Sequence, residues 1–272
     1  MRGIHDIELS KLTHKKIVVD TSIYLYKYKS QESLLPRMEQ FILTFKSLNI
    51  TPIFVFDGKP KPMKQKTLQE RQRRKNVAWE KYTRLVKDSP PESLQYLKNQ
   101  FTKINQTDVA EVKKLMDSLG TIYLDAPNEA DEVCATLMLT DQVYGCISDD
   151  MDMLIHGCNY VIREVNIDAQ TAVMYNLSNI LKSLHMNHHT FKQLCVLSGT
   201  DYHSTTFTLF HSIHLLKLYN KSTSTDFYEW LEKMGYVNDL ETLKSAYNMF
   251  EIKLPVSLVP TFGNADSCTA AS

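Results

Sequence analysis

The chain has 272 residues, of which 43% are hydrophobic and 23% are charged. This composition is typical of a globular protein and excludes a wholly disordered, collagen-like or coiled-coil chain. No run of about 18 apolar residues is present, and the N-terminal residues lack the apolar core of a secretory signal, so no membrane partner is expected. The five cysteines are scattered and odd in number, which argues against a disulfide framework and favours a reducing compartment.

The net charge of zero conceals an uneven distribution of charged residues. Lys and Arg number 31, as do Asp and Glu, but residues 59–87 contain 11 basic residues and only two acidic ones. This segment therefore has a net charge of +9, and the rest of the chain has −9. A basic segment beside an acidic remainder is typical of a protein that binds a polyanion.

Short apolar runs alternate with helical patterns along most of the chain. In chain order, the patterns predict a strand over 15–20, a helix over 31–48, a strand over 51–57, helices over 64–87 and 107–119, a strand over 121–125, a helix over 129–142, strands over 144–148, 160–165 and 171–176, and mostly helices from 177 to about 250. Residues 255–272, with two prolines, one glycine and many small residues, are predicted to form a disordered tail. The alternation predicts an α/β fold with a mostly parallel sheet.

Acidic residues stand where the predicted strands end. Asp20 and Asp57 end the first two strands, Glu129 and Asp131 open the helix after the third, and Asp149, Asp150 and Asp152 follow the fourth. The carboxyl ends of parallel strands meet at one edge of a sheet, so we expect these acids to lie close together. Their mutual repulsion would be relieved by Mg²⁺ or Mn²⁺, and two such ions about 3.5–4 Å apart would form a phosphodiester-cleaving site. Taken singly, each acid is more often a helix cap or a turn residue.

Five sequence blocks resemble the flap endonuclease/XPG-type family of structure-specific 5′ nucleases. They are IVVDTSIYLY (17–26), IFVFDGKPKPMK (53–64), YLDAPNEADEVCA (123–135), CISDDMDMLIHG (146–157) and LCVLSGTDY (194–202), and their order and spacing follow the family over residues 3–202. The resemblance implies a PIN-like 5′-nuclease fold, in which helices flank a mostly parallel central sheet and a helical arch covers the active site. It implies one nuclease domain over 1–254, composed of an N-terminal region (about 1–87), a helical gateway or cap (64–120) and an internal region with C-terminal helices (121–254).

The resemblance also implies a site with two Mg²⁺ ions, which Mn²⁺ can replace. Asp20, Asp57, Glu129 and Asp150 would hold the first ion or its waters, and Asp131, Asp152 and Asp201 would lean toward the second. Lys64 and Arg71, seven and fourteen residues after Asp57, match the family's catalytic basic pair, which holds the scissile phosphate. Without the resemblance, the pair would be two members of a solvated basic stretch.

Nucleic-acid contacts are expected along the basic segment and at one tyrosine. Tyr26 matches an aromatic residue that stacks on a base near the cleavage point, although a core tyrosine is the alternative. Nucleic acid is expected to bind at Lys59, Lys61, Arg73, Arg74 and Lys75, beneath a cap that passes single-stranded 5′ ends in the family. Four aromatic residues lie nearby, and we expect at least two of them to pack inside the cap instead of stacking on bases: Trp79, Tyr82, Tyr96 and Phe101.

The sequence departs from the family's pattern after Tyr202. Residues 203–219 contain no glycine, whereas the family has a glycine-rich hairpin there that holds the downstream duplex through backbone amides. Because such an amide cradle normally needs the positive φ of glycine, we expect the duplex grip to be altered or absent. The tail shows no sliding-clamp-binding motif. Short, divergent family members in large DNA viruses include messenger-RNA endonucleases, which keeps RNA open as a substrate.

The sequence thus predicts a Mg²⁺-dependent 5′ nuclease that cleaves branched or flapped DNA as an endonuclease and a 5′ exonuclease, in replication, repair or recombination. One alternative is an endoribonuclease on the same scaffold. Another is a non-catalytic factor that binds nucleic acid or a protein partner. The nucleus or a viral replication site is the expected location, and no sequence pattern indicates the oligomeric state.

Overall fold

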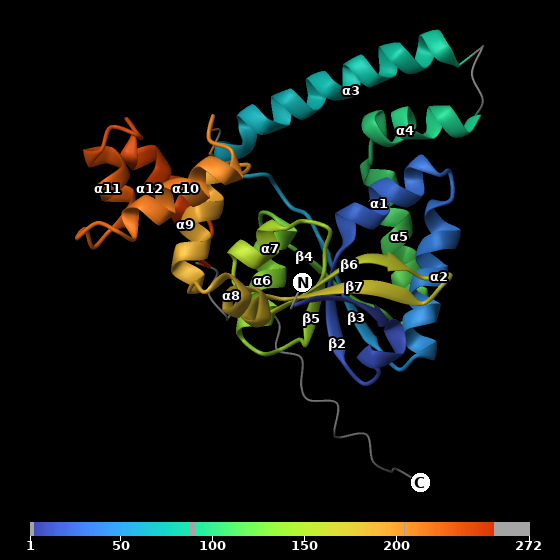
Figure 1. Cartoon of the computed structure of the whole chain (residues 1–272). Helices are drawn as coiled ribbons and strands as arrows, with labels where there is room; N and C mark the ends of the chain where they lie inside the picture. Colours follow the sequence, from blue (N-terminus) through green and yellow to red (C-terminus); the bar gives the residue numbers. More distant parts are fainter. Residues whose placement is uncertain (1–2, 87–90, 204, 253–272) are drawn as a thin grey trace.

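The computed structural model of the chain describes residues 3–86, 91–203 and 205–252, and its centre is a seven-stranded sheet (Figure 1). The strands are β1 (Ile4–Glu8), β2 (Lys16–Asp20), β3 (Thr51–Phe56), β4 (Ile122–Asp125), β5 (Gly145–Ile147), β6 (Tyr160–Asn166) and β7 (Thr171–Asn176). They lie in the order β1-β7-β6-β5-β2-β3-β4. Strands β1, β6, β5, β2, β3 and β4 all run in one direction, and β7 runs opposite to them, antiparallel to β1 and β6. The predicted α/β fold with a mostly parallel sheet is confirmed.

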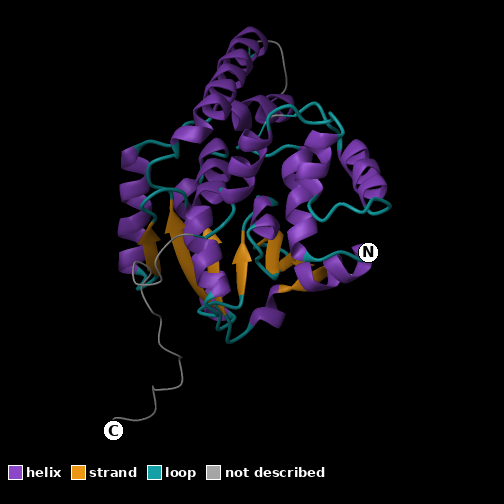
Figure 2. Cartoon of the chain, turned by 90° about the vertical axis from the view of Figure 1, so that its left-hand side faces the viewer, coloured by secondary structure: helices purple, strands orange, loops and turns teal. Residues whose placement is uncertain are grey.

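Helices cover both faces of this sheet and extend beyond it (Figures 1 and 2). The described residues form α1 (Thr21–Ser30), α2 (Leu34–Ser47), α3 (Gln65–Leu85), α4 (Pro91–Phe101), α5 (Gln106–Ser118), α6 (Ala130–Leu139), α7 (Asp152–Ile155), α8 (Leu177–Leu184), α9 (His188–Ser198), α10 (Leu209–Tyr219), α11 (Phe227–Lys233) and α12 (Leu240–Asn248), with short 3₁₀ turns η1 (Leu9–Leu12) and η2 (Pro62–Lys64). None of these helices is both long enough and apolar enough to cross a membrane.

Strand β2 shows why the predicted strands appear in the sequence as unbroken apolar runs. Its side chains alternate between two apolar layers, so both sets must be hydrophobic. Ile17 and Val19 pack with α1, α2 and α5, whereas Val18 packs with α6, α7 and α8 on the opposite face. A third cluster joins α9, α10, α11 and α12 into a separate helical group beside the sheet.

Helix α2, which was predicted as a helix over 31–48, buries one apolar stripe. Met38, Phe41, Ile42 and Phe45 are fully buried, whereas Leu35 stays 36% exposed at the edge of the stripe. The ring of Phe41 lies 4.8 Å from that of Tyr24, 4.5 Å from that of Phe45 and 5.7 Å from that of Phe54. Phe41 therefore links α1 and α2 to the central strand β3.

Helices α3 and α4 project from the body of the protein. The 21-residue α3 runs out over the top of the molecule, and α4 returns beneath it toward α1 (Figure 1). Trp79, Tyr82 and Phe101 contact one another where the two helices meet, with ring centroids 5.0–6.1 Å apart, although Trp79 is 52% exposed and Tyr96 is 72% exposed. Tyr82 and Phe101 are half-buried in this contact, in line with the expectation that at least two of these aromatics pack inside the cap.

The C-terminal part of the segment 64–120 does not project. Helix α5 packs through Val112 and Met116 into the apolar layer beneath α2, so it belongs to the body of the fold. The predicted disordered tail over 255–272 lies outside the described residues.

Replacing Phe41 by Ala is expected to destabilise the protein by about 3–5 kcal/mol, because it leaves a cavity among three aromatic rings. Leu43→Ala on the same helix should change the free energy of unfolding by less than about 0.5 kcal/mol, because Leu43 is 47% exposed. Urea denaturation of both variants measures the difference, and equal losses would contradict the assigned core.

Candidate active site

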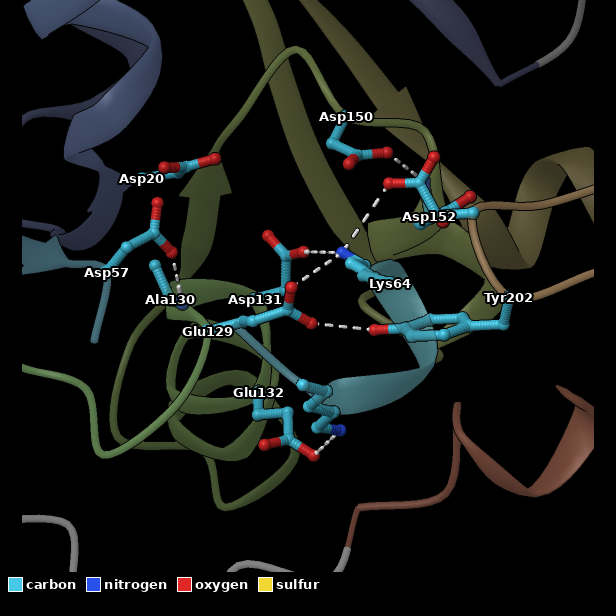
Figure 3. Close-up of polar contacts among 12 residues, drawn as sticks. Asp20, Asp57, Lys64, Glu129, Ala130, Asp131, Glu132, Asp150, Asp152 and Tyr202 are labelled. Carbon is cyan, nitrogen blue, oxygen red and sulfur yellow. Dashed lines mark hydrogen bonds and ion pairs between the residues drawn. The ribbon is translucent and has the colours of Figure 1, made fainter. Parts of the chain in front are cut away.

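The acids predicted at the strand ends lie around one cleft. Asp20 ends β2, and Asp57 directly follows the neighbouring parallel strand β3. Glu129 and Asp131 lie at the start of α6, while Asp150 and Asp152 come from the turn after β5 (Figure 3). A cleft of about 610 Å³ is lined by six of the seven predicted acids, namely Asp20, Asp57, Glu129, Asp131, Asp150 and Asp201. Asp152 lines an adjoining hollow of about 530 Å³ together with Asp150 and Asp201.

Hydroxyl groups tie the acids of different strands to one another. Asp57 accepts hydrogen bonds from Ser22 Oγ at 2.5 Å and from the Ala130 backbone amide at 2.8 Å. Asp20 accepts from Ser148 Oγ and from the Ser22 backbone amide, both at 3.2 Å. Ser22 and Ser148 therefore brace the acids, although the sequence reasoning did not select them. A serine one or two residues beyond each strand end is the sequence signal that was available.

Asp149, Asp150 and Asp152, which follow β5, have different roles. Asp150 Oδ1 accepts a hydrogen bond from the Asp152 backbone amide at 2.8 Å, which fixes both residues beside the cleft. Asp149 instead accepts from the Glu164 backbone amide at 3.1 Å. Asp149 therefore braces the neighbouring strand β6, although it also lines the cleft.

Crowding makes the acids costly to ionise. Burial, followed by the charge of Asp57, raises the pKa of Asp20 to about 7. Burial and then Asp150 raise the pKa of Asp152 to about 7, and burial and then Asp20 raise that of Asp131 well above its usual range. A group of buried carboxylates that resists ionisation favours a bound cation, and carboxylate oxygens suit a hard divalent ion.

These acids are not drawn together into metal-ligand geometry. Over residues 3–86, 91–203 and 205–252, no three histidine, cysteine, aspartate or glutamate side chains are arranged closely enough to hold one ion. Instead, Lys64 places its ammonium group among them. Its Nζ lies 3.0 Å from Glu129 Oε1, 3.6 Å from Asp201 Oδ2 and 4.0 Å from Asp131 Oδ2 (Figure 3).

Lys64 and Arg71 both reach the acids from the start of α3. Burial lowers the pKa of Lys64, but the charges of Asp131, Glu129 and Asp201 outweigh burial and raise it, so the side chain is a cation. Arg71 follows Lys64 by seven residues, or about two helical turns. Its Nη2 lies 2.7 Å from Asp201 Oδ2, and 56% of its side chain is exposed. The two cations therefore sit at the cleft, as expected for groups that hold a phosphate.

Tyr202 is a third residue, after Ser22 and Ser148, that the sequence did not predict as part of the site. Its hydroxyl donates a hydrogen bond to Glu129 Oε2 at 2.8 Å, and Lys64 Nζ lies 5.0 Å from its ring centroid. The residue directly follows Asp201 in the LSGTDY block, which was the only available signal.

The other predicted nucleic-acid contacts differ in their surroundings. Tyr26 is 41% exposed, lines the cleft and has Lys75 Nζ 4.9 Å from its ring, so it is not a core tyrosine. Lys59, Arg73 and Arg74 are exposed. Lys61 forms a 2.5 Å ion pair with Glu132, and only 15% of its side chain is exposed. The charge of Lys61 is therefore satisfied within the protein.

Lys75, whose ammonium lies over the ring of Tyr26, is partly shielded from water. Burial, and then the charges of Lys103 and Arg71, lower the pKa of Lys75.

The connection after α9 lies where the family has its glycine-rich hairpin. Gly199 there has a φ of 108°, and no described residue from 200 to 208 has a positive φ. The backbone feature of a glycine hairpin is therefore not seen in the described part of this connection.

Replacing Asp152 by Asn is expected to stabilise the metal-free protein by about 1–3 kcal/mol at pH 8, because one pH unit of pKa displacement corresponds to about 1.4 kcal/mol. The folded-state pKa of about 7 exceeds the unfolded value of about 4. The destabilising effect of Asp152 therefore grows from pH 4 to pH 7 and is constant above it. Urea denaturation in EDTA at pH 5 and pH 8 measures this gain, with the exposed Glu111→Gln as the control. If Asp152→Asn does not raise the free energy of unfolding at pH 8, the raised pKa of Asp152 is wrong.

Two family models match the segments of the chain that carry most of the acids. Residues 1–78 match the model of the XPG N-terminal domain, and residues 120–201 match that of the XPG I-region. The chain is 32% identical over 221 residues to flap endonuclease 1 of Encephalitozoon cuniculi, a match that covers 75% of this chain and 64% of that relative. The chain thus spans less than two thirds of the relative's length.

Solved structures share the fold. The catalytic core of Rad2 in complex with DNA substrate superposes with a TM-score of 0.66 at 21% identity, covering 92% of this chain and 82% of that one. The Holliday junction-resolving enzyme GEN1 in complex with product DNA, Mg²⁺ and Mn²⁺ ions superposes with a TM-score of 0.59 at 18% identity, covering 93% and 56%. Nucleases of this family depend on divalent metal ions. The family-model matches and the flap endonuclease relative, together with the acids around one cleft, show that the chain belongs to the flap endonuclease/XPG-type family of 5′ nucleases.

Proposed function

We propose that the chain is a Mg²⁺-dependent, structure-specific 5′ nuclease that hydrolyses phosphodiesters in branched or flapped DNA, as an endonuclease and as a 5′ exonuclease, in replication, repair or recombination. The observation that supports this most directly is the cleft in which six acids face Lys64 and Arg71. A negatively charged substrate backbone can approach such a cleft only if cations neutralise the acids.

The seven acids divide into two proposed ligand sets. Asp20, Asp57, Glu129 and Asp150 would hold one Mg²⁺ or its waters, and Asp131, Asp152 and Asp201 would hold the other, with Mn²⁺ as a substitute. When bound, the two ions lower the pKa of the attacking water and stabilise the negative charge that develops on the phosphate. The raised pKa values of Asp20, Asp131 and Asp152 support such a role, because these carboxylates lack enough positive charge around them.

Basic residues of the chain would position the scissile phosphate. Arg71 is largely exposed and shares Asp201 with Lys64, so an incoming phosphate can replace that carboxylate as its partner. Tyr26 lies in the wall of the same cleft with an exposed ring, where a base next to the cleaved bond can stack. The exposed Lys59, Arg73 and Arg74 would attract the strand along the start of α3.

Purified protein is expected to cleave labelled 5′-flap DNA in Mg²⁺, and faster than it cleaves linear duplex DNA or single-stranded RNA. Asp150→Ala and Asp152→Ala should each lower the cleavage rate by at least about 10²-fold, because each removes a ligand from the charged site. Gel-based cleavage assays with and without Mg²⁺ measure this, and circular dichroism checks that both variants are folded.

Other outcomes of the same assay distinguish the alternatives. Cleavage of RNA alone would replace the proposed substrate with RNA on the same scaffold. Tight binding of DNA without cleavage in either Mg²⁺ or Mn²⁺ would identify a non-catalytic binding factor and would contradict the proposal.

Replacing both Lys64 and Arg71 by Ala is expected to lower the single-turnover cleavage rate by about 10²-fold or more, because both cations meet at the acid cleft. The matched control is Arg73→Ala with Arg74→Ala, which removes two charges from exposed positions on the same helix. The control should weaken DNA binding and its salt dependence more than the cleavage rate. Equal effects of the two double variants on rate and binding would show that Lys64 and Arg71 act only through their positive charge and have no specific role at the scissile phosphate.

A further inference from the structure

Tyr202 occupies a junction between the acid cleft and the C-terminal helices. It directly follows Asp201 and packs against the apolar cluster formed by α9 to α12. Its ring meets the ring of Phe250 edge-on, with centroids 5.3 Å apart, and Phe250 is itself only 2% exposed. The apolar part of the tyrosine is thus fixed in the helical group, and its hydroxyl points toward the sheet.

The polar end of Tyr202 acts on one particular acid. Its hydroxyl donates to Glu129 Oε2 at 2.8 Å, while Lys64 Nζ lies 3.0 Å from Glu129 Oε1 (Figure 3). The two oxygens of Glu129 therefore each have a partner, and the same Lys64 ammonium lies 5.0 Å from the centre of the tyrosine ring. Glu129 precedes α6 and has no side-chain hydrogen bond that caps this helix, so these two contacts are what orient its carboxylate.

We propose that Tyr202 is a positioning residue for the divalent cation site, which sets the orientation of the Glu129 carboxylate through its hydroxyl and restrains Lys64 through its ring. This inference rests on the proposed function, because it takes Glu129 as a cation ligand. Groups that hydrogen-bond to a ligating carboxylate orient it, and their loss typically weakens metal affinity by about 10–100-fold.

Tyr202 also offers a mechanical link between two parts of the chain. The helical group of α9 to α12 contacts the cleft through this side chain, and Phe250 follows the end of α12 by two residues. A change in the packing of Phe250 would therefore reach Glu129 through a single aromatic ring. No other described tyrosine hydroxyl donates to one of the seven predicted acids.

Tyr202→Phe tests this role, because it removes the hydroxyl and keeps the ring. Isothermal titration calorimetry with Mn²⁺ is expected to show affinity about tenfold weaker than in the wild-type protein. At saturating metal the KM for flap DNA should be unchanged, and the Mg²⁺ concentration that gives half-maximal cleavage should rise by a similar factor. Tyr228→Phe is the matched control, since it removes another tyrosine hydroxyl, which donates to the Gln193 backbone carbonyl at 2.9 Å.

A double-mutant cycle with Glu129→Gln separates positioning from general stability. In the Glu129→Gln background, Tyr202→Phe should have little further effect on Mn²⁺ affinity, because the carboxylate that it orients is gone. Equal Mn²⁺ affinity of the wild type and Tyr202→Phe, or equal weakening in Tyr228→Phe, would overturn the assignment and leave the proposed function intact. A wild-type protein that binds Mn²⁺ but does not cleave would overturn the proposed function alone. A wild-type protein that binds no Mn²⁺ would overturn both.

Discussion

Repulsion among carboxylates at one edge of the sheet explains how the cleft is built. Parallel strands deliver Asp20, Asp57 and Asp150 to the same edge, and burial removes the water that would screen them. The chain offsets part of the cost with the ammonium of Lys64, with Arg71 and with serine hydroxyls. The pKa values of Asp20 and Asp152 remain raised to about 7, so the compensation is incomplete, which supports the proposed cation site.

Helix α3 serves this constraint in two ways. Lys64, at the N-cap of α3, and Arg71, in its second turn, both reach Asp201. The remaining length of the helix carries basic side chains away from the cleft over the top of the molecule (Figure 1). Thr67 adds a hydrogen bond from its hydroxyl to the Asp201 backbone carbonyl at 2.9 Å. The helix that covers the acids is thus anchored to the residue that both of its cations contact. This arrangement joins the proposed phosphate-binding groups and the proposed metal ligands into one unit.

Central strands and acid positions were predictable from sequence because both depend on local patterns. Strands β2 and β3 are buried on both faces and therefore read as continuous apolar runs, and each is followed by its acid. Strand β1 was missed because it is an edge strand with a single fully buried residue among five, and α1 because its apolar positions show no helical stripe. Helix α4 was missed because it begins at Pro91, directly after Pro90, and such a pair of prolines is more typical of a turn than of a helix.

Tertiary partners, in contrast, could not be read from the sequence. Lys61 belongs to the same basic run as its exposed neighbours, yet Glu132, 71 residues further on, neutralises it. The hydroxyl of Tyr202 meets Glu129 only because α9 returns to the sheet edge, a contact between residues 73 positions apart. Pairings of this kind depend on how separate elements pack, and the residue types alone leave many partners open.

Anomalous diffraction from a crystal grown or soaked in Mn²⁺ tests the central claim most directly. We expect two anomalous peaks in the cleft, one beside Asp20, Asp57, Glu129 and Asp150 and the other beside Asp131, Asp152 and Asp201, with the Lys64 ammonium moved away from the acids. Absence of both peaks at saturating Mn²⁺, with the carboxylates still paired to Lys64 and Arg71, would contradict it.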